Sequence, residues 1–299
     1  MKIAIIGSGI SGLTAAYLLN RQHDISVFEA SSWVGGHTHT VDVQVDGHHY
    51  AIDTGFIVFN DWTYPNFIEL LNQLGVTYQP TEMSFSVCDP ASGVEYNGNT
   101  LNSLFAQRRN LLSRPFWRML ADLVRFNGLT TRLALAGSEA QLREPIGDFL
   151  QREGFSEAFR EGYLLPMVAC IWSCPVQQMM RFPMATLIRF CHNHGLLQVT
   201  NRPQWYTVAG GSREYVRRLM AALPDARLNT PVHSLIPLGD EGGAGVMVHS
   251  AVGAERFDDV VLATHADQAL AVLGTGATAT EQQVLGAIRY HRNRAVLHT

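Results

Sequence analysis

The chain has 299 residues, of which 46% are hydrophobic and 16% charged, and its formal net charge is -4. This composition is typical of a globular protein, and the negative balance argues against nucleic acid as a partner, because nucleic acid needs a strongly basic face. No apolar run is long enough to span a membrane, and glycines interrupt the amino-terminal apolar segment, so neither a membrane span nor a secretory signal is expected. The four cysteines, at positions 88, 170, 174 and 191, lack the paired spacing of structural zinc sites. They predict a reducing, cytoplasmic environment and no metal centre.

The first thirty residues predict a strand, a tight turn, a helix and a second strand that ends on an acid. The apolar run 3–6 enters the turn at Gly7, Gly9 and Gly12, a helix follows over 13–20, and the second strand runs from Ile25 to Glu29. This order and spacing are typical of a site that binds the diphosphate and ribose of a dinucleotide.

Each residue of this segment has a physical role in such a site. Gly7 allows the sharp turn, Gly9 lets the backbone approach the diphosphate, and Gly12 lets the helix pack closely on the sheet. The amides at the start of the helix face the diphosphate, and Glu29 accepts hydrogen bonds from a ribose, which disfavours NADP. The cofactor-binding residues predicted here are Gly7, Gly9, Ile10, Ser11, Gly12, Glu29 and Ala30.

The next seventy residues predict mostly short strands. Gly35 and Gly36 allow another close backbone approach. Strands are expected at 41–45 and 49–52 around the hairpin turn Asp46-Gly47, followed by a segment at 53–59 that pivots on Gly55. The helical spacing over 64–74 ends at Gly75, and a second hairpin is expected between 83–88 and 94–96.

The middle third of the sequence predicts helices, and the last third predicts mixed α/β structure. Helices are expected over 111–135, from Pro145, and over 182–194. After residue 200 the pattern predicts a helix at 213–223, strands at 227–232, 234–238, 245–249 and 259–264, a helix from His265, and a strand at 294–299. We therefore expect a discontinuous α/β domain, 1–80 with 200–299, and an inserted, mostly helical domain at 81–199.

These pieces together resemble the flavin-containing amine oxidase and phytoene desaturase superfamily, in particular the bacterial amine oxidase-like proteins described as predicted NAD/FAD-binding proteins. Similar domains are associated with cyclopropane fatty acid synthases. The resemblance implies a Rossmann-like FAD-binding domain of the GR2 type, FAD as the cofactor, and a substrate pocket beside the inserted helices.

The resemblance extends to further positions. The family carries Gly-Gly-Arg-Thr where this chain has Gly35-Gly36-His37-Thr38, so His37 stands where an arginine neutralises the phosphates, and it is a weaker, pH-dependent donor. It also implies that Gly55 and Phe56 pass the flavin ring, that the backbone of Val232 meets adenine, and that Thr264 lies near the adenine half.

Two departures from the family pattern bear on the reaction. Relatives commonly place a lysine near flavin N5, in a segment resembling the one at Arg294; arginine is a planar donor that does not readily lose its proton. Lys2 is the only lysine and lies in the first strand, so amine oxidation by the usual route is in question. The family also closes its FAD site with a carboxy-terminal Gly-Asp segment, which is not found, so we expect the chain to be a fragment of a longer protein.

The function expected is FAD-dependent oxidation, with hydride transfer from a small amine or a lipid-like substrate to flavin N5. No catalytic base is predicted, and Trp172, Trp205 and Tyr206 are candidates for the pocket or for the core. The alternatives are an NAD-dependent oxidoreductase, which would not need the second glycine pair, and a non-catalytic flavoprotein partner of a lipid-modifying enzyme.

Several other residues are open to more than one interpretation. His39 is expected to be a solvated strand residue, and Cys170 and Cys174 are small buried side chains or, less favoured, a redox pair. Residues 108–132 are rich in arginine and aromatic residues and are expected to pack as an amphipathic helix. The alternative is weak contact with an anionic membrane surface, with Phe116 and Trp117 as wedges.

Overall fold

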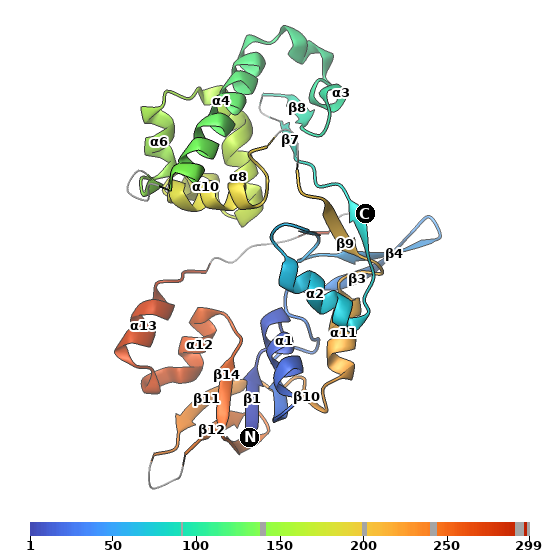
Figure 1. The fold of residues 1–299 in the computed structure, drawn as a ribbon, viewed down its shortest axis with the longest axis vertical. Helices are drawn as coiled ribbons and strands as arrows, with labels where there is room; N and C mark the ends of the chain where they lie inside the picture. Colours follow the sequence, from blue (N-terminus) through green and yellow to red (C-terminus); the bar gives the residue numbers. More distant parts are fainter. Residues whose placement is uncertain (91, 138–141, 199–201, 240–243, 291–295, 298–299) are drawn as a thin grey trace. The chain divides into compact units, whose positions relative to one another are not determined.

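Figure 1 shows the fold in a computed structural model, which describes residues 1–90, 92–137, 142–198, 202–239, 244–290 and 296–297. The chain divides into two compact units. Unit 1 contains Met1–Val58, Asn66–Gln79 and Thr207–Thr299, and unit 2 contains Phe59–Pro65 and Pro80–Tyr206. The mixed α/β class predicted from the sequence is confirmed.

A four-stranded parallel sheet forms the centre of unit 1, in the order β10-β2-β1-β14. Its strands are β1 Lys2–Ile6, β2 Asp24–Phe28, β10 Asp225–Arg227 and β14 Asp259–Leu262. The last four residues of β1 and of β2 are buried, as expected for parallel strands covered on both faces. Helix α1 (Ile10–Leu19) connects them, so the predicted strand, turn, helix and strand are confirmed.

Two predictions for this sheet are wrong in part. β14 was expected to be a buried strand, but it is an edge strand and its residues are half-buried or exposed. The strand expected over 227–232 does not form: β10 ends at Arg227 and β11 (Val232–Pro237) begins at Val232, because Asn229 turns the chain with φ +50° and Pro231 cannot donate to a ladder.

A three-stranded antiparallel sheet packs against the parallel one through a shared apolar cluster. It consists of β11, β12 (Val246–Ser250) and β13 (Gly253–Phe257), and the sequence did not predict β13. The buried members of the cluster are Ala4, Ile6, Phe28, Leu235, Val248, Phe257 and Val272. Burial of these side chains joins the two sheets into one core.

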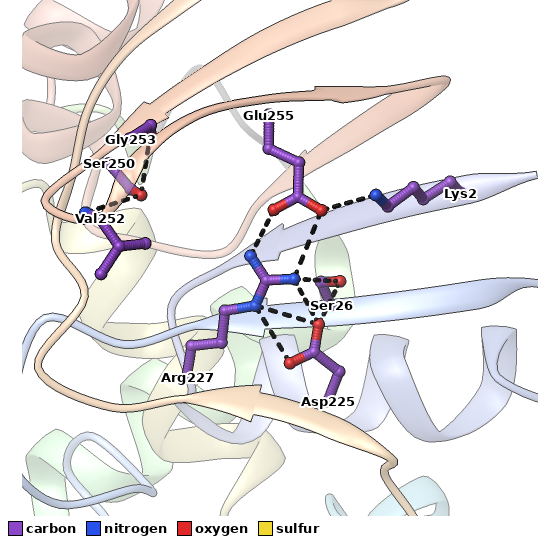
Figure 2. A network of polar contacts seen from close by, with 8 residues as sticks. All are labelled: Lys2, Ser26, Asp225, Arg227, Ser250, Val252, Gly253 and Glu255. Carbon is purple, nitrogen blue, oxygen red and sulfur yellow. Dashed lines mark hydrogen bonds and ion pairs between the residues drawn. The ribbon is translucent and has the colours of Figure 1, made fainter.

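A polar network ties the same two sheets together at the edge of this cluster (Figure 2). Arg227 Nε and Nη2 donate to the two carboxylate oxygens of Asp225 at 3.0 and 2.6 Å, and its Nη1 donates to Glu255. Lys2 Nζ lies 2.6 Å from Glu255, and Ser26 donates to Asp225 at 2.6 Å. Side chains of four strands, β1, β2, β10 and β13, are therefore joined in one network around the guanidinium group, with Lys2 of β1 linked to it through Glu255.

We expect Arg227→Met to lower the free energy of unfolding by about 2 kcal/mol, because two carboxylates lose a charge-assisted partner. Hydrogen bonds from Arg227 hold the pKa of Asp225 and of Glu255 below their ordinary values. A depressed carboxyl pKa stabilises the fold above the unfolded pKa of about 4, and that stabilisation disappears as the pH falls. The difference between wild type and variant should therefore shrink between about pH 5 and pH 3 in urea unfolding.

The matched control is Lys2→Met, which removes a single half-buried ion pair and should cost less than about 1 kcal/mol. Equal losses from the two variants, or a loss from Arg227→Met that stays constant with pH, would contradict this account of the network.

The remaining elements of unit 1 agree closely with those predicted from the sequence. The hairpin of β3 (Thr40–Val45) and β4 (His48–Asp53) turns at Asp46 and Gly47, both of which have positive φ, and α2 (Pro65–Leu74) ends at Gly75. The remaining helices of the unit are α11 Arg213–Ala221, α12 Ala266–Leu273, η3 Gly274–Gly276 and α13 Ala279–Gly286. The strand predicted at 294–299 lies largely outside the described residues.

Unit 2 is mostly helical around an aromatic core that includes Phe126, Phe149 and Phe159. Its helices are α3 Leu101–Leu104, η1 Arg108–Leu112, α4 Arg114–Ala136, α6 Ile146–Arg152, α7 Glu157–Phe159, η2 Arg160–Leu164, α8 Leu165–Trp172, α9 Val176–Met179 and α10 Met184–Asn193. The hairpin predicted before them is β7 Ser86–Asp89 with β8 Val94–Asn97, and β5 Phe59–Asn60, β6 Tyr78–Thr81 and β9 Trp205–Val208 form a small sheet.

The predicted helix over 111–135 begins later than expected. Ser113 caps α4 by accepting a hydrogen bond from the amide of Phe116, and a proline lies in the first turn, so residues 108–112 form a separate 3-10 turn. Phe116 is only 5% exposed and packs against Tyr96 and Phe105. This burial agrees with the expected packing of the helix, and the alternative, in which Phe116 is a membrane wedge, is wrong.

Candidate functional site

The candidate site lies where β1, β2 and β14 end, and its tightest element is the turn after β1. Gly7 has φ +105°, and its amide donates to the carbonyl oxygen of Phe28 at 2.8 Å. A Cβ atom added at Gly7 would lie 2.6 Å from the carbonyl oxygen of Ala263. Both the backbone conformation and the lack of space therefore require glycine here.

The other two glycines of the turn differ in what surrounds them. A Cβ atom at Gly12 would lie 2.0 Å from the carbonyl oxygen of Gly7, so this glycine is required for packing. A Cβ atom at Gly9 would meet no protein atom within 4 Å, and Gly9 has φ -65°, which any residue adopts. The protein itself therefore gives no reason for glycine at position 9, and the space beside it is open to a ligand.

The start of α1 faces this open space. Gly9 is its N-cap and provides no side-chain cap, and the first hydrogen bond of the helix runs from the amide of Leu13 to Gly9 at 2.9 Å. The amides of Ile10 and Ser11 precede that bond, and both residues are exposed. Backbone amides without an acceptor inside the helix, at a helix start, are the donors that bind a phosphate group.

The second glycine pair lies directly on the first turn. The amide of Gly35 donates to the carbonyl oxygen of Ser8 at 3.0 Å, and a Cβ atom at Gly36 would lie 3.2 Å from the Cα atom of Gly9. Gly35 and Gly36 have φ +108° and +59°. Two segments that lie apart in the sequence thus bring five glycines to one place.

Glu29 lies at the end of β2 and is fixed by two serines. Its Oε2 accepts from the amide of Ser8 at 3.0 Å and from the Ser8 hydroxyl, and its Oε1 accepts from the amide of Ser31 at 2.8 Å. A carboxylate has about four acceptor positions, so one remains for a ribose hydroxyl. Sequence reasoning missed Ser8, which is fully buried inside the Gly-x-Gly turn, and its position there was the available signal. Ala30, the next residue, is exposed.

The segments around His37 and Gly55 are in direct contact with each other. The amide of Phe56 donates to the carbonyl oxygen of His37 at 3.3 Å, and a Cβ atom at Gly55 would lie 2.0 Å from that oxygen. Thr38 is buried, and its hydroxyl forms a 2.5 Å hydrogen bond with Tyr215. Burial raises the pKa of Tyr215 to about 12, so the phenol stays neutral.

Asp53 begins the Asp-Thr-Gly-Phe segment that the resemblance places along the flavin ring, although it was not itself predicted to bind the cofactor. Its carboxylate accepts from the amide of Ser212 at 2.9 and 3.0 Å, from the Ser212 hydroxyl at 2.9 Å, and from Thr40 at 2.6 Å. These bonds join the end of β4 to the residue before α11. The polar triplet Asp-Thr-Gly was the sequence signal for this residue.

Thr264 and Val232 border the turn and β2, respectively. The methyl group of Thr264 would be 3.3 Å from a Cβ atom at Gly7. Val232 begins β11, two residues after Thr230, whose amide donates to the carbonyl oxygen of Glu29 at 2.8 Å. Val232 thus follows a segment anchored to the end of β2, on the side where Glu29 lies.

The other candidates lie apart from this cluster or in the core. His39 is exposed, as expected, but it lies just before β3 rather than in a strand, and its Nδ1 atom is 3.1 Å from the Thr54 hydroxyl. Trp172 packs against Phe182 and Phe190 in unit 2. Cys170 is exposed, contrary to the expectation of burial, and Cys174 donates to Gln178. Arg294 lies outside the described residues.

The chain matches one protein-family model, described as flavin containing amine oxidoreductase, over residues 10–290. Cyclohexylamine oxidase from Brevibacterium oxydans IH-35A has a similar structure, with a TM-score of 0.69, 20% identity, and coverage of 95% of this chain and 62% of that one. A putrescine oxidase bound to putrescine gives a TM-score of 0.64 at 20% identity, covering 96% of this chain and 63% of that one.

Among curated sequences, a 1-hydroxycarotenoid 3,4-desaturase from Flavobacterium sp. is 33% identical over 96 residues, which is 32% of this chain and 18% of that protein. The chain thus spans less than two thirds of the similar structures and under a fifth of this relative. The open space at Gly9, the amides of α1 and the remaining acceptor position of Glu29 fit the diphosphate and the adenine ribose of FAD.

The contrast between Gly9 and Gly12 gives a matched test of this fit. We expect Gly9→Ala to fold with an unchanged melting temperature, because the added methyl group meets no protein atom, and to bind FAD at least about tenfold more weakly, because it occupies the path of the diphosphate. Gly12→Ala should instead lose about 1–3 kcal/mol of stability through overpacking. Calorimetric titration and thermal unfolding would measure the two effects, and a Gly9→Ala protein that binds FAD as tightly as wild type would contradict the assignment.

Proposed function

Because the chain belongs to the flavin containing amine oxidoreductase family, we propose that it forms the FAD-binding part of an FAD-dependent oxidoreductase. The observation that carries this proposal is Gly9, the N-cap of α1, beside which the space is open although the neighbouring glycines Gly7 and Gly12 are tightly packed. An NAD-dependent enzyme is a weaker alternative, because the second glycine pair at Gly35 and Gly36 extends the site beyond the first turn.

The proposed roles follow from the geometry of unit 1. The amides of Ile10 and Ser11 would hold the diphosphate, and Glu29, kept in place by Ser8 and Ser31, would accept a hydrogen bond from the adenine ribose. Gly55 and Phe56, which lie against the carbonyl of His37, would border the flavin end. When bound, FAD supplies the hydride acceptor, and the protein supplies position and electrostatics.

We propose a small amine or a lipid-like molecule as the substrate. The similar structures include putrescine and cyclohexylamine oxidases, and the curated relatives include carotenoid desaturases. Both kinds of reaction remove a hydride from carbon. The arginine at position 294, where the family resemblance implies lysine, favours a substrate other than a simple amine.

A purified preparation should show flavin absorption in the visible blue, and a Gly9→Ala preparation should show far less of it at equal protein concentration. Anaerobic mixing with putrescine, cyclohexylamine and an unsaturated lipid should bleach the flavin with at least one of them. Absorption limited to the nicotinamide band near the ultraviolet would support the NAD alternative. Flavin that no substrate reduces would instead support a non-catalytic partner of a lipid-modifying enzyme.

We also propose weak contact of residues 108–132 with an anionic membrane surface. Between Glu95 and Asp122 the sequence has four arginines, 108, 109, 114 and 118, and no acid. The same stretch exposes Leu101, Leu112 and Trp117 to 77%, 90% and 50%. Exposed apolar side chains among arginines are typical of surfaces that insert shallowly into anionic headgroups. In the described residues, no helix is both long and apolar enough to cross a bilayer.

The membrane proposal predicts that the protein sediments with vesicles containing phosphatidylglycerol and much less with pure phosphatidylcholine. Leu112→Gln should weaken sedimentation about fivefold to thirtyfold, since burial of one leucine contributes roughly 1–2 kcal/mol. Val124→Gln is the control, because Val124 is 64% exposed but lies further along α4. Equal effects of the two substitutions, or equal binding to both kinds of vesicle, would contradict the proposal. For its location we propose the cytoplasm, which suits four free cysteines.

A further inference from the structure

Tyr215 lies in the first turn of α11 and connects that helix to the segment that follows the second glycine pair. It is only 1% exposed, and its hydroxyl forms a 2.5 Å hydrogen bond with the hydroxyl of Thr38, which is also buried. A buried hydroxyl without a partner is costly, so each of the two side chains holds the other in place. The hydrogen bond thus fixes the residue after His37 to α11.

The ring of Tyr215 extends this connection to the segment at Gly55 and Phe56, through Phe67 of α2. The Phe67 ring lies 5.2 Å from the Tyr215 ring at 84° and 5.3 Å from the Phe56 ring at 83°. Edge-to-face contacts of this kind favour one relative orientation of the rings. Phe56 is therefore positioned by the same side chain that packs against Tyr215.

The backbone closes these contacts into a loop within unit 1. The amide of Phe56 donates to the carbonyl oxygen of His37 at 3.3 Å, and His37 is covalently bonded to Thr38. In a closed loop, neither Thr38 nor Phe56 can shift without breaking at least one of the contacts. The position of Phe56 relative to Thr38 therefore depends on Tyr215.

The same turn of α11 also contacts neighbouring residues of these segments. The amide of Arg213 donates to the hydroxyl of Thr40 at 3.0 Å, and a Cβ atom at Gly35 would lie 3.3 Å from a methyl group of Val216. The helix thus supports the chain on both sides of Thr38, and the Tyr215 hydroxyl provides the bond to Thr38 itself.

We propose that Tyr215 is a positioning residue for the flavin end of the site, because it fixes Phe56 against the segment at His37 and Thr38. This inference rests on the proposed binding of FAD. Tyr215 is almost completely buried, so it acts through Thr38 and Phe67 rather than by contact with the cofactor. Cofactor that meets a preformed surface loses less affinity to the ordering of side chains and loops.

The test is calorimetric titration of the full chain with FAD and with ADP-ribose, which carries the diphosphate and the adenosine without flavin. Tyr215→Phe should bind FAD about tenfold more weakly, because the flavin end is no longer preformed, and should bind ADP-ribose within about twofold of wild type. The visible absorption of the bound flavin should also shift towards that of free FAD, since a looser site admits water. A merely structural hydroxyl would change both affinities equally and leave this spectrum unaltered.

Thr38→Val removes the other partner of the hydrogen bond, and the double variant separates positioning from stability. Each single substitution leaves one buried hydroxyl unsatisfied and should lower the melting temperature by about 2–4 °C. The double variant leaves neither hydroxyl and should recover most of that loss. Its affinity for FAD should stay low, because the bond between α11 and the segment is still missing.

Tyr96→Phe is the matched control. Tyr96 is 3% exposed and its hydroxyl donates to the carbonyl oxygen of Gly162 at 2.7 Å, so this substitution also deletes a buried hydrogen bond, but in unit 2. It should lower the melting temperature by a similar amount and change neither affinity.

Three results would overturn the inference: wild-type affinity for FAD in Tyr215→Phe, equal losses of affinity for the two probes in that variant, or FAD affinity that recovers in the double variant. If wild type binds neither FAD nor ADP-ribose, the proposed FAD site itself is wrong, and the two failures are thereby distinguished.

Discussion

The close contact between backbone segments at the end of β1 is the constraint on which the rest of unit 1 depends. Gly7 lies against the carbonyl of Ala263 and Gly12 against the carbonyl of Gly7, so sheet, turn and helix meet without side chains between them. Any Cβ atom at these two positions would separate the elements. Gly9, between these two glycines, faces open space. The same short turn therefore provides both the close packing of the elements and the proposed binding site.

Carboxylates fix the loops that surround this turn. Glu29 and Asp53 each accept hydrogen bonds from a backbone amide and a serine hydroxyl of another segment, Ser8 and Ser212 respectively. Bonds between a carboxylate and amides are strong and directional, so they fix loops that have little apolar burial of their own. A dinucleotide would therefore meet a site whose main-chain donors are already oriented, which reduces the ordering cost of binding.

The sequence predicted local structure well where one residue type decides it. The glycine turn, the Asp46-Gly47 hairpin and the helix ending before Gly75 were predicted because positive φ or the lack of a Cβ atom leaves few alternatives. Predictions failed where tertiary contacts decide. Nothing in the pattern of residues 111–135 distinguished Phe116, which is buried against Tyr96, from Trp117, which is half-exposed. The exposed edge position of β14 likewise depends on strand order, which no local pattern encodes.

The sequence alone therefore determined the dinucleotide fingerprint, the acid at its end and the mixed α/β class, because these depend on spacing along one short stretch of chain. Tertiary structure alone decided that Ser8 holds Glu29, that Arg227 joins two sheets, and that His37 stacks on His265. Each of these contacts joins residues from separate strands or loops. Their meeting depends on how the sheets pack and on the order of the strands, and single-sequence periodicity contains no information about either.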